Sequence, residues 1–194
     1  MNDTNPILVA LSKIAPLTRE EIEFIASGAE PRNYKKGEML TKEGDVENYV
    51  YFILKGGVRN YCTHDGEELD LDFFFEGDFT NSFMSFLLRE KSIVNVKALV
   101  DTQVLRFHVD FVRKLYEDSL NFNKIGRIVA ESLYIRRTRR ELSFITHSAK
   151  ERYEFLLANH PEFVQRIPLK YLASFLGINP ETLSRIRKAM ASKK

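Results

Sequence analysis

The stretch IPLKYLASFLGINPETLSRIRKAMA, residues 167–191, decides the fold, because it predicts two short helices joined by a tight turn. Gly177 stands where a left-handed residue ends the first helix. Asn179 is a suitable N-cap for the second helix, and Pro180 suits its first position, where the missing N–H costs nothing. An apolar stripe at helical spacing runs along the first helix, formed by Leu169, Leu172, Ala173 and Leu176. The stretch is therefore predicted to be a helix-turn-helix.

The second predicted helix presents a polar face that suits the major groove of DNA. An arginine can donate two hydrogen bonds to guanine O6 and N7, and a glutamate can accept one from cytosine N4. The apolar side chains lie on the opposite face: Leu183, Ile186 and Met190. We therefore predict that bases are read by Glu181, Ser184 and Arg185. Phosphate contacts orient a protein without reading sequence, and we assign them to Lys170, Asn179, Thr182 and Lys188.

An ordinary helical hairpin is the alternative, since a charged helix face is usually only a solvated one. The positions of the glycine, the cap and the proline favour DNA reading. The distribution of charge also favours DNA binding, because residues 124–194 contain 15 Lys/Arg against 6 Asp/Glu, a net charge of +9. Residues 1–123 contain 14 Lys/Arg against 21 Asp/Glu, a net of −7. A basic C-terminal part is typical of polyanion binding, so the acidic part is expected to have another role.

The composition is that of an ordinary globular protein. At 194 residues the chain can form one large or two modest domains. No stretch has the length of a membrane span, and the first residues do not resemble a secretory leader. The single cysteine, Cys62, excludes a disulfide framework within the chain and fits a reducing compartment. We expect a cytoplasmic protein without a membrane partner.

Residues 31–107 show the sequence pattern of short strands separated by glycines. The glycine pairs and triplets recur at the spacing of an all-β barrel or jelly roll: Lys36-Gly37, Glu43-Gly44-Asp45, Lys55-Gly56-Gly57, Asp65-Gly66 and Glu76-Gly77-Asp78. Asp65-Gly66 suits a type I′ hairpin turn. Two predicted strands each bury one face, with Leu69, Leu71, Phe73 and Phe75 in the first and Val94, Val96, Ala98 and Val100 in the second.

Helices are predicted on both sides of this region. Two short ones precede it, at 6–14 and after a cap at Thr18, and a connecting helix follows at 109–115. Residues 121–145 form one long helix, and a capping box at 148–151 begins another that runs to Asn159.

The long helix has more apolar surface than two small domains can cover. Its seam contains Phe122, Ile125, Ile128, Val129, Leu133, Ile135 and Leu142. Pairing with a second copy of the chain would cover the seam and place two reading helices about 34 Å apart, one turn of DNA. Packing within one chain is the alternative. The arginines at 136, 137, 139 and 140 are expected to solvate the end of the helix, with phosphate contact as the secondary alternative, and residues 144–147 are expected to form a hinge.

The helix-turn-helix resembles the signature of the Crp/Fnr family of bacterial transcription regulators, carried by Leu172-Ala173, Leu176-Gly177-Ile178 and Glu181-Thr182-Leu183-Ser184-Arg185. The resemblance implies that Glu181 and Arg185 read bases. Relatives often have an arginine just before the glutamate, where this chain has Pro180, so the sequence preference is expected to differ. The glycines at 37, 44, 56 and 77 are similar to those of the cyclic-nucleotide-binding β-roll in that family. The roll there precedes the helix-turn-helix domain, which we call the reader.

The phosphate cassette departs from the family pattern. Counted from Gly77-Asp78-Phe79, the ribose-binding Gly-Glu pair is replaced by Asn81-Ser82, and the phosphate-binding Arg-Ser pair by Ser92-Ile93. A buried phosphate needs charge-assisted donors, so we expect no response to cyclic AMP. Arg89 or Lys91 could move in, but one displaced cation does not rebuild the site. The pocket around Asn81, Ser82, Ser92 and Ile93 is predicted to bind another small effector, or nothing.

No cofactor, metal or catalytic residue is predicted. An iron–sulfur cluster of the kind found in some relatives needs several thiolates, which Cys62 alone does not supply. Haem ligation is not excluded by residue count, but the four histidines are expected to be surface residues or to be bonded locally: His64, His108, His147 and His160. A cupin-like metal-dependent enzyme is a remote alternative, since only two histidines lie in or beside the barrel.

Together these features predict an α+β chain with a double-stranded β-roll sensor at 1–118, a dimerisation helix and hinge at 119–146, and a helix-turn-helix domain at 147–194. Many relatives continue into a β-hairpin wing, which we expect this reader to lack. The predicted function is that of a homodimeric regulator of transcription that binds a palindromic operator in double-stranded DNA. RNA polymerase is a further partner implied by the resemblance. The alternative is an effector-independent DNA-binding protein whose roll serves only as a dimer scaffold.

Overall fold

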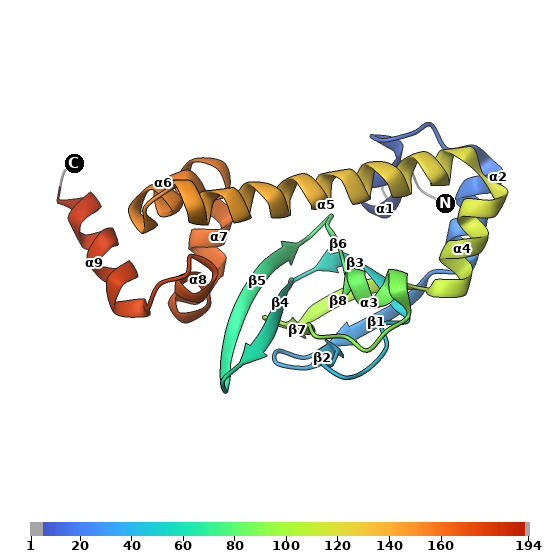
Figure 1. Cartoon of the computed structure of the whole chain (residues 1–194). Helices are drawn as coiled ribbons and strands as arrows, with labels where there is room; N and C mark the ends of the chain where they lie inside the picture. The colour runs from blue at the N-terminus through green and yellow to red at the C-terminus, as the bar shows by residue number, and fades with distance from the viewer. Residues whose placement is uncertain (1–5, 193–194) are drawn as a thin grey trace. The chain divides into compact units, whose positions relative to one another are not determined.

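The computed structural model describes residues 6–192 (Figure 1). These residues divide into two compact units, one made of residues 6–60 and 73–134 and the other of residues 61–72 and 135–192. The second unit therefore contains the tip of a hairpin that extends from the strands of the first. Each unit has its own core.

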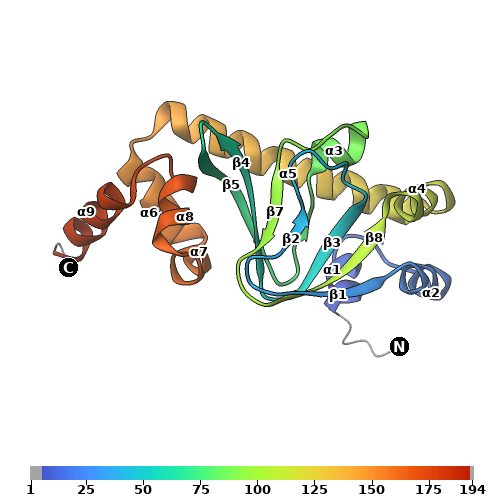
Figure 2. The same cartoon turned by 90° about the horizontal axis from the view of Figure 1, so that it is seen from below.

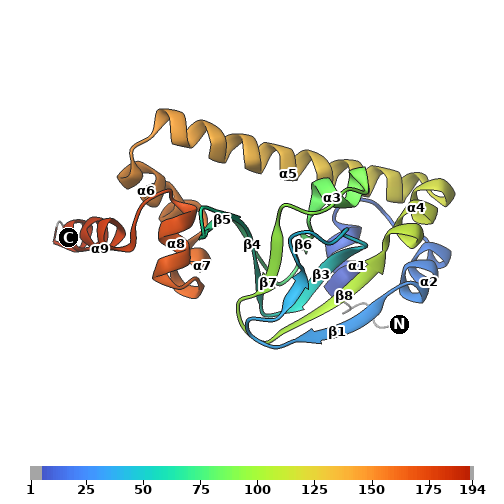
Figure 3. The same ribbon diagram turned by 60° about the horizontal axis from the view of Figure 1, so that its bottom comes forward.

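Eight strands form two four-stranded sheets, seen from two further directions in Figures 2 and 3. The first sheet has the order β1-β8-β3-β6, with β1 at Glu30–Tyr34, β8 at Thr102–His108, β3 at Tyr49–Lys55 and β6 at Phe79–Thr80. The second has the order β2-β7-β4-β5, with β2 at Met39–Thr41, β7 at Asn95–Ala98, β4 at Gly57–His64 and β5 at Glu67–Phe75. The pairings β1–β8, β3–β8, β3–β6 and β2–β7 are antiparallel. This is the predicted β-roll.

Two glycine turns show why the strands end where they do. At Gly56, φ is 99°, and an added Cβ would lie 2.6 Å from Thr102 Oγ1 and 2.7 Å from the carbonyl oxygen of Asp101. Only glycine fits such a close approach with a positive φ. Between β4 and β5, φ is 50° at Asp65 and 80° at Gly66, as the predicted type I′ turn requires.

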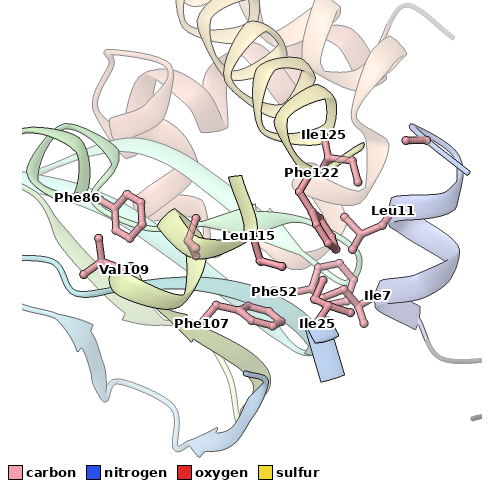
Figure 4. Packing of buried hydrophobic residues seen from close by; sticks show 12 residues of the cluster. Ile7, Leu11, Ile25, Phe52, Phe86, Phe107, Val109, Leu115, Phe122 and Ile125 are labelled. Atoms are coloured by element: carbon pink, nitrogen blue, oxygen red, sulfur yellow. The ribbon is translucent and has the colours of Figure 1, made fainter. Parts of the chain in front are cut away.

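One hydrophobic cluster of the first unit lies where helices cover the end of the roll (Figure 4), and a second lies between strands of the roll. Helices α1 (Pro6–Ser12) and α2 (Arg19–Ser27) contribute side chains, as do α4 (Val109–Asp118) and the start of α5 (Leu120–Thr146). Figure 3 shows α2 beside α4, where the rings of Phe24 and Phe111 lie 5.2 Å apart. Thr18 and Glu21 form a complete capping box at α2, which confirms the helix start predicted there. A further helix, α3 at Phe83–Leu88, was not predicted.

Helix α5 is 27 residues long and confirms the long helix predicted over 121–145. Its first turns are covered, with Phe122 and Ile125 buried. Further along, Ile135, Leu142 and Ile145 are 48%, 52% and 76% exposed. Within the described residues, no helix combines the length and apolar character needed to span a membrane.

The helical part of the second unit contains α6 (Ala149–Asn159), α7 (Pro161–Arg166), α8 (Leu169–Phe175) and α9 (Pro180–Ala191). Ser148 and Glu151 form the predicted capping box of α6. Helix α7 was not predicted: Pro161 starts a short helix whose Phe163 is buried. Its core consists of Tyr153, Leu156, Phe163, Ile167, Leu172, Ala173, Leu176 and Leu183.

The predicted alternation of buried and exposed residues fails near the tip of β5 and at the end of β7. Leu69 is 39% exposed and Val100 44% exposed, whereas Asp70 is 1% exposed. At the hairpin, the reason is tertiary: the backbone N–H of Asp70 donates to Ser174 Oγ in α8, so this part of the hairpin packs against α8 and Asp70 is covered, whereas Leu69 remains partly exposed. Val100 lies beyond the last residue of β7.

Candidate nucleic-acid interface

The turn between α8 and α9 is built by the residues that the sequence pattern indicated. Gly177 follows the end of α8 with a φ of 67°, in the left-handed region that glycine occupies without strain. Asn179 Oδ1 accepts a hydrogen bond of 2.8 Å from the backbone N–H of Thr182, and Pro180 is the first residue of α9. The two helices, the glycine turn and the N-cap predicted from the sequence are confirmed.

One face of α9 anchors it and the other faces solvent. Leu183 is fully buried, and Ile186 and Met190 are partly buried. The residues on the opposite side are exposed: Glu181, Ser184, Arg185 and Lys188. Because the anchoring side chains follow the helical period, the exposed residues are turned away from the core of their own unit. All three base-reading candidates therefore share one accessible face.

The four phosphate candidates have different surroundings. Lys170 in α8 and Lys188 in α9 are exposed. Asn179 is exposed, but its side-chain oxygen is occupied by the cap. Thr182 is half-buried, and its hydroxyl accepts a hydrogen bond of 3.1 Å from Arg185 Nη2. The structure thus links Thr182 with Arg185, a connection that spacing alone did not reveal.

Arg187 is an exposed cation on α9 that the sequence analysis left out. It precedes Lys188 by one residue, which offsets it by about 100° around the helix. It consequently flanks the reading face, where a phosphate rather than a base could be reached. The sequence shows that Arg187 is charged. Only the structure shows that its side chain is exposed although Leu183, one turn earlier, is buried.

Three of the four cassette positions are buried in the roll. Asn81, Ser82 and Ser92 are buried. Ser92 Oγ donates to Ser82 Oγ at 2.7 Å, and the backbone N–H of Ser82 donates to Glu47 Oε2 at 3.1 Å. The fourth residue, Ile93, is 59% exposed and lies outside this buried group.

Glu47 is the centre of this polar interior. It is 1% exposed and accepts hydrogen bonds from the backbone N–H of Tyr49 at 3.0 Å and from the hydroxyl of Thr41. Burial raises the pKa of Glu47, while its hydrogen bonds act in the opposite direction. The polar groups that could receive a ligand are thus bonded to one another.

The two cations that the sequence analysis considered for the cassette are Arg89 and Lys91. Arg89 Nη1 donates to the carbonyl oxygens of Glu47, at 2.5 Å, and of Phe86, at 3.4 Å, and its Nη2 donates to Asn48. Lys91 is exposed. The guanidinium of Arg89 is therefore engaged with the loop around it rather than with the two buried serines.

Each histidine has a partner within two residues in the sequence. His64 lies 3.5 Å from a carboxylate oxygen of Asp65, and His108 Nδ1 accepts from the backbone N–H of Asp110. His147 contacts Thr146 Oγ1 at 2.7 Å and His160 contacts Glu162 at 3.3 Å. Across residues 6–192, no three His, Cys, Asp or Glu side chains are grouped so that they could hold a metal ion. The local bonding expected of the histidines is confirmed.

Comparison with known proteins agrees with this arrangement. Residues 31–119 match the cyclic nucleotide-binding domain family. The cyclic AMP receptor protein of Thermus thermophilus is 27% identical over 184 residues, which cover 90% of this chain and 83% of that protein. The chain is thus homologous to regulators of the Crp/Fnr type.

Solved structures share the fold at lower identity. The c-di-GMP responsive global regulator CLP of Xanthomonas campestris superposes with a TM-score of 0.70 at 20% identity, covering 91% of this chain and 93% of that one. A CooA mutant from Carboxydothermus hydrogenoformans gives a TM-score of 0.75 at 17% identity, covering 100% and 87%. The predicted fold class is confirmed.

Proposed function

From the premise that this chain is a transcription regulator of the Crp/Fnr type with a cyclic nucleotide-binding domain, we propose that it acts as a homodimer that binds a palindromic site in double-stranded DNA. The observation that carries the proposal is the outward face of α9, where Glu181, Ser184 and Arg185 are exposed on a helix anchored by the buried Leu183. Arg185 would pair with a guanine and Glu181 with a cytosine in the major groove. Lys170, Thr182 and Lys188, with Asn179 at the helix N-terminus, would contact phosphates.

Dimerisation is proposed through α5. Beyond its covered first turns, the helix exposes Ile135, Leu142 and Ile145. Ile135 and Leu142 are one heptad apart, and Ile145 follows three residues later, so the three side chains lie near one another on the helix surface. A second copy of the same helix is the partner that matches this spacing. A two-fold axis would then present two copies of α9 to successive turns of the major groove, about 34 Å apart.

The proposed regulator does not respond to cyclic AMP. The support for this is the cassette, where Ser82 and Ser92 bond each other and the guanidinium of Arg89 is bound to carbonyl oxygens. An effector of other chemistry would have to displace these bonds. A roll that takes no effector and only supports the dimer is the second candidate, and it is favoured by the same internal bonding. RNA polymerase remains a proposed partner, and the role we infer is regulatory rather than catalytic.

Selection of bound sequences from a random pool of duplex DNA tests this proposal. We expect the full chain to enrich an inverted repeat whose half-sites are one helical turn apart, because a two-fold dimer reads the same bases twice. Enrichment of no sequence, or of a single unpaired half-site, would contradict it. Titration of cyclic AMP and other nucleotides against the melting temperature separates the two views of the roll, since a ligand that prefers the native state raises that temperature.

A further inference from the structure

The second compact unit joins three segments that are far apart in the sequence: the β4–β5 hairpin tip at 61–72, the end of α5, and α8 with its turn. Ser174 in α8 connects two of them. Its Oγ accepts a hydrogen bond of 2.9 Å from the backbone N–H of Asp70 and donates one of 3.2 Å to the carbonyl oxygen of Glu68. The hairpin is therefore bonded to the first helix of the helix-turn-helix.

Arg140 in α5 connects all three segments. Its Nη2 donates to the carbonyl oxygen of Asp70 in the hairpin and to that of Phe175 at the end of α8, both at 3.0 Å. Its guanidinium lies 4.7 Å from the ring centre of Phe144 and 4.8 Å from that of Phe175. A planar guanidinium with several donors can hold two carbonyl groups and stack on two rings at once, which an ammonium group does not do.

Burying the Arg140 side chain costs free energy, because a charged group is taken partly out of water. This indicates that the side chain does more than keep the end of the helix solvated. Burial lowers the pKa of the Arg140 guanidinium, and the carboxylates of Asp72 and Asp70 act in the opposite direction. Its Nε is buried, and no residue of the described part of the chain accepts a hydrogen bond from it. The sequence analysis expected this arginine to solvate the helix end, and that expectation is wrong because the side chain is directed inward.

Arg152 in α6 also contacts Phe144. Its guanidinium lies 4.6 Å from the ring centre of Phe144, and its Nη2 and Nε donate to the carbonyl oxygen of Leu176 at 2.9 and 3.2 Å. Two guanidinium groups, those of Arg140 and Arg152, thus lie within 5 Å of the ring centre of Phe144. The ring also abuts the turn, since a Cβ added at Gly177 would lie 2.5 Å from its Cε1.

We infer that Arg140 is a positioning residue for DNA recognition: it fixes the turn of the helix-turn-helix to the end of α5 and to the hairpin. This inference rests on the proposed function. Only His147 and Ser148 lie between the end of α5 at Thr146 and the start of α6 at Ala149, so without such a contact the helix-turn-helix would be held to α5 by a short link alone. A dimer that must place two reading helices in successive grooves loses affinity when either helix samples many orientations.

The hairpin contributes charge as well as carbonyl groups. Residues 61–72 contain five carboxylates and no Lys or Arg: Asp65, Glu67, Glu68, Asp70 and Asp72. Arg136 in α5 pairs with Asp72 at 2.5 Å, in a partly buried contact. An acidic hairpin is repelled by DNA phosphates, so its contact with α8 serves the position of the reader rather than a DNA contact of its own.

The test compares Arg140→Met with Arg139→Met in the full chain. Both variants lose one cation from the same turn of α5, but Arg139 is exposed. The probes are a palindromic duplex selected by the wild-type protein and a random duplex of the same length, with binding measured by fluorescence anisotropy at one salt concentration. We expect R140M to bind the selected duplex about tenfold more weakly, and the random duplex less than about threefold more weakly, because only specific binding needs a fixed orientation. R139M should bind the selected duplex about as tightly as the wild type.

Ser174→Ala provides a second, milder variant in case R140M does not fold. We expect it to lower affinity for the selected duplex alone, and R140M/S174A to lose less than the sum of the single losses, since both side chains hold the same hairpin. Equal affinity of folded R140M and wild type for the selected duplex, tighter binding by R140M, or equal losses on both duplexes would overturn the inference. If R140M is unfolded, the inference would be overturned by an S174A variant that binds the selected duplex as tightly as the wild type. A wild-type protein that prefers no duplex would instead refute the proposed function.

Discussion

Polar side chains are arranged in opposite ways in the roll and on helix α9. In the roll, Ser82, Ser92 and Glu47 are buried and hydrogen-bonded to their own chain. On α9, Ser184 and Glu181 are exposed on the face away from Leu183. The same residue types therefore have different chemical availability, because a buried polar group must find a partner within the protein, whereas an exposed one can exchange water for a ligand.

This contrast separates two regions that a family resemblance treats alike. A helix-turn-helix can bind DNA if a few exposed side chains fit the major groove. The residues that form its core can vary. A cyclic-nucleotide pocket needs a cation and acceptors directed at an internal site. In this chain Arg185 faces solvent, as the first requirement asks, whereas the guanidinium of Arg89 is bonded to carbonyl oxygens of its own loop.

The largest effect is expected from Arg185→Ala. It should remove specific binding and leave weak, salt-sensitive association, because each bidentate arginine–guanine pair contributes about 1–3 kcal/mol and a dimer would contain two. Anisotropy titrations on selected and random duplexes measure this difference. Lys188→Ala is the companion variant, and it should weaken both kinds of binding about equally. Equal losses on both duplexes for Arg185→Ala would contradict its role in base reading.

Gly177→Ala should destabilise the reader while the roll keeps its structure. The positive φ at this residue costs a non-glycine residue about 1–3 kcal/mol, and the new methyl group would also meet Phe144. Chemical denaturation followed by hydrogen exchange measures the loss in each unit separately. Gly66→Ala, with a positive φ and no atom within 4 Å of the added Cβ, is the control for backbone strain alone. If both variants lose the same free energy of unfolding, the contact with Phe144 is unimportant.

A smaller effect is expected from the buried carboxyl of the roll. Because burial raises the pKa of Glu47, the folded protein binds more protons there than the unfolded chain. Its contribution to the free energy of unfolding is therefore full below the ordinary glutamate pKa and is lost as pH rises through the raised one. The free energies of unfolding of the wild type and Glu47→Gln are measured by denaturation over the pH range between these two pKa values. The difference between the two proteins gives the contribution of Glu47 at each pH. A difference that does not change with pH, or that grows as pH rises, would contradict the assigned burial of the charge.

Cyclic AMP should have the smallest effect. With the cassette serines bonded to each other, saturating nucleotide is expected to leave the melting temperature unchanged. Differential scanning fluorimetry tests this, with another nucleotide at the same concentration as the control for ionic effects. A concentration-dependent rise with cyclic AMP alone would show that the roll rearranges to bind it.

The sequence predicted most where structure is local. Gly177, Asn179 and Pro180 act within one turn of the chain, so the helix-turn-helix could be recognised from spacing and caps. Helix α3 was missed because its six residues, FMSFLL, form a short apolar run that periodicity does not distinguish from a strand. Helix α7 is equally short.

Tertiary contacts account for what spacing could not indicate. The burial of Asp70 and the exposure of Leu69 depend on α8, which lies more than a hundred residues further along the chain. The inward direction of Arg140 depends on carbonyl groups from two distant segments. For the candidate interface, the exposure of Glu181, Ser184, Arg185 and Lys188 on α9 could be predicted from the sequence. The Thr182–Arg185 hydrogen bond and the exposed Arg187 were not predicted.

The central claim is that two copies of α9 read bases in successive major grooves. Dimethyl sulfate footprinting of the selected duplex tests it most directly, because this reagent methylates guanine N7, the acceptor that an arginine would occupy. The account predicts two protected guanine positions about 10 base pairs apart, related by the symmetry of the repeat, with protection lost in Arg185→Ala. Guanines that remain fully reactive in a saturated complex, or protection that persists in Arg185→Ala, would contradict it.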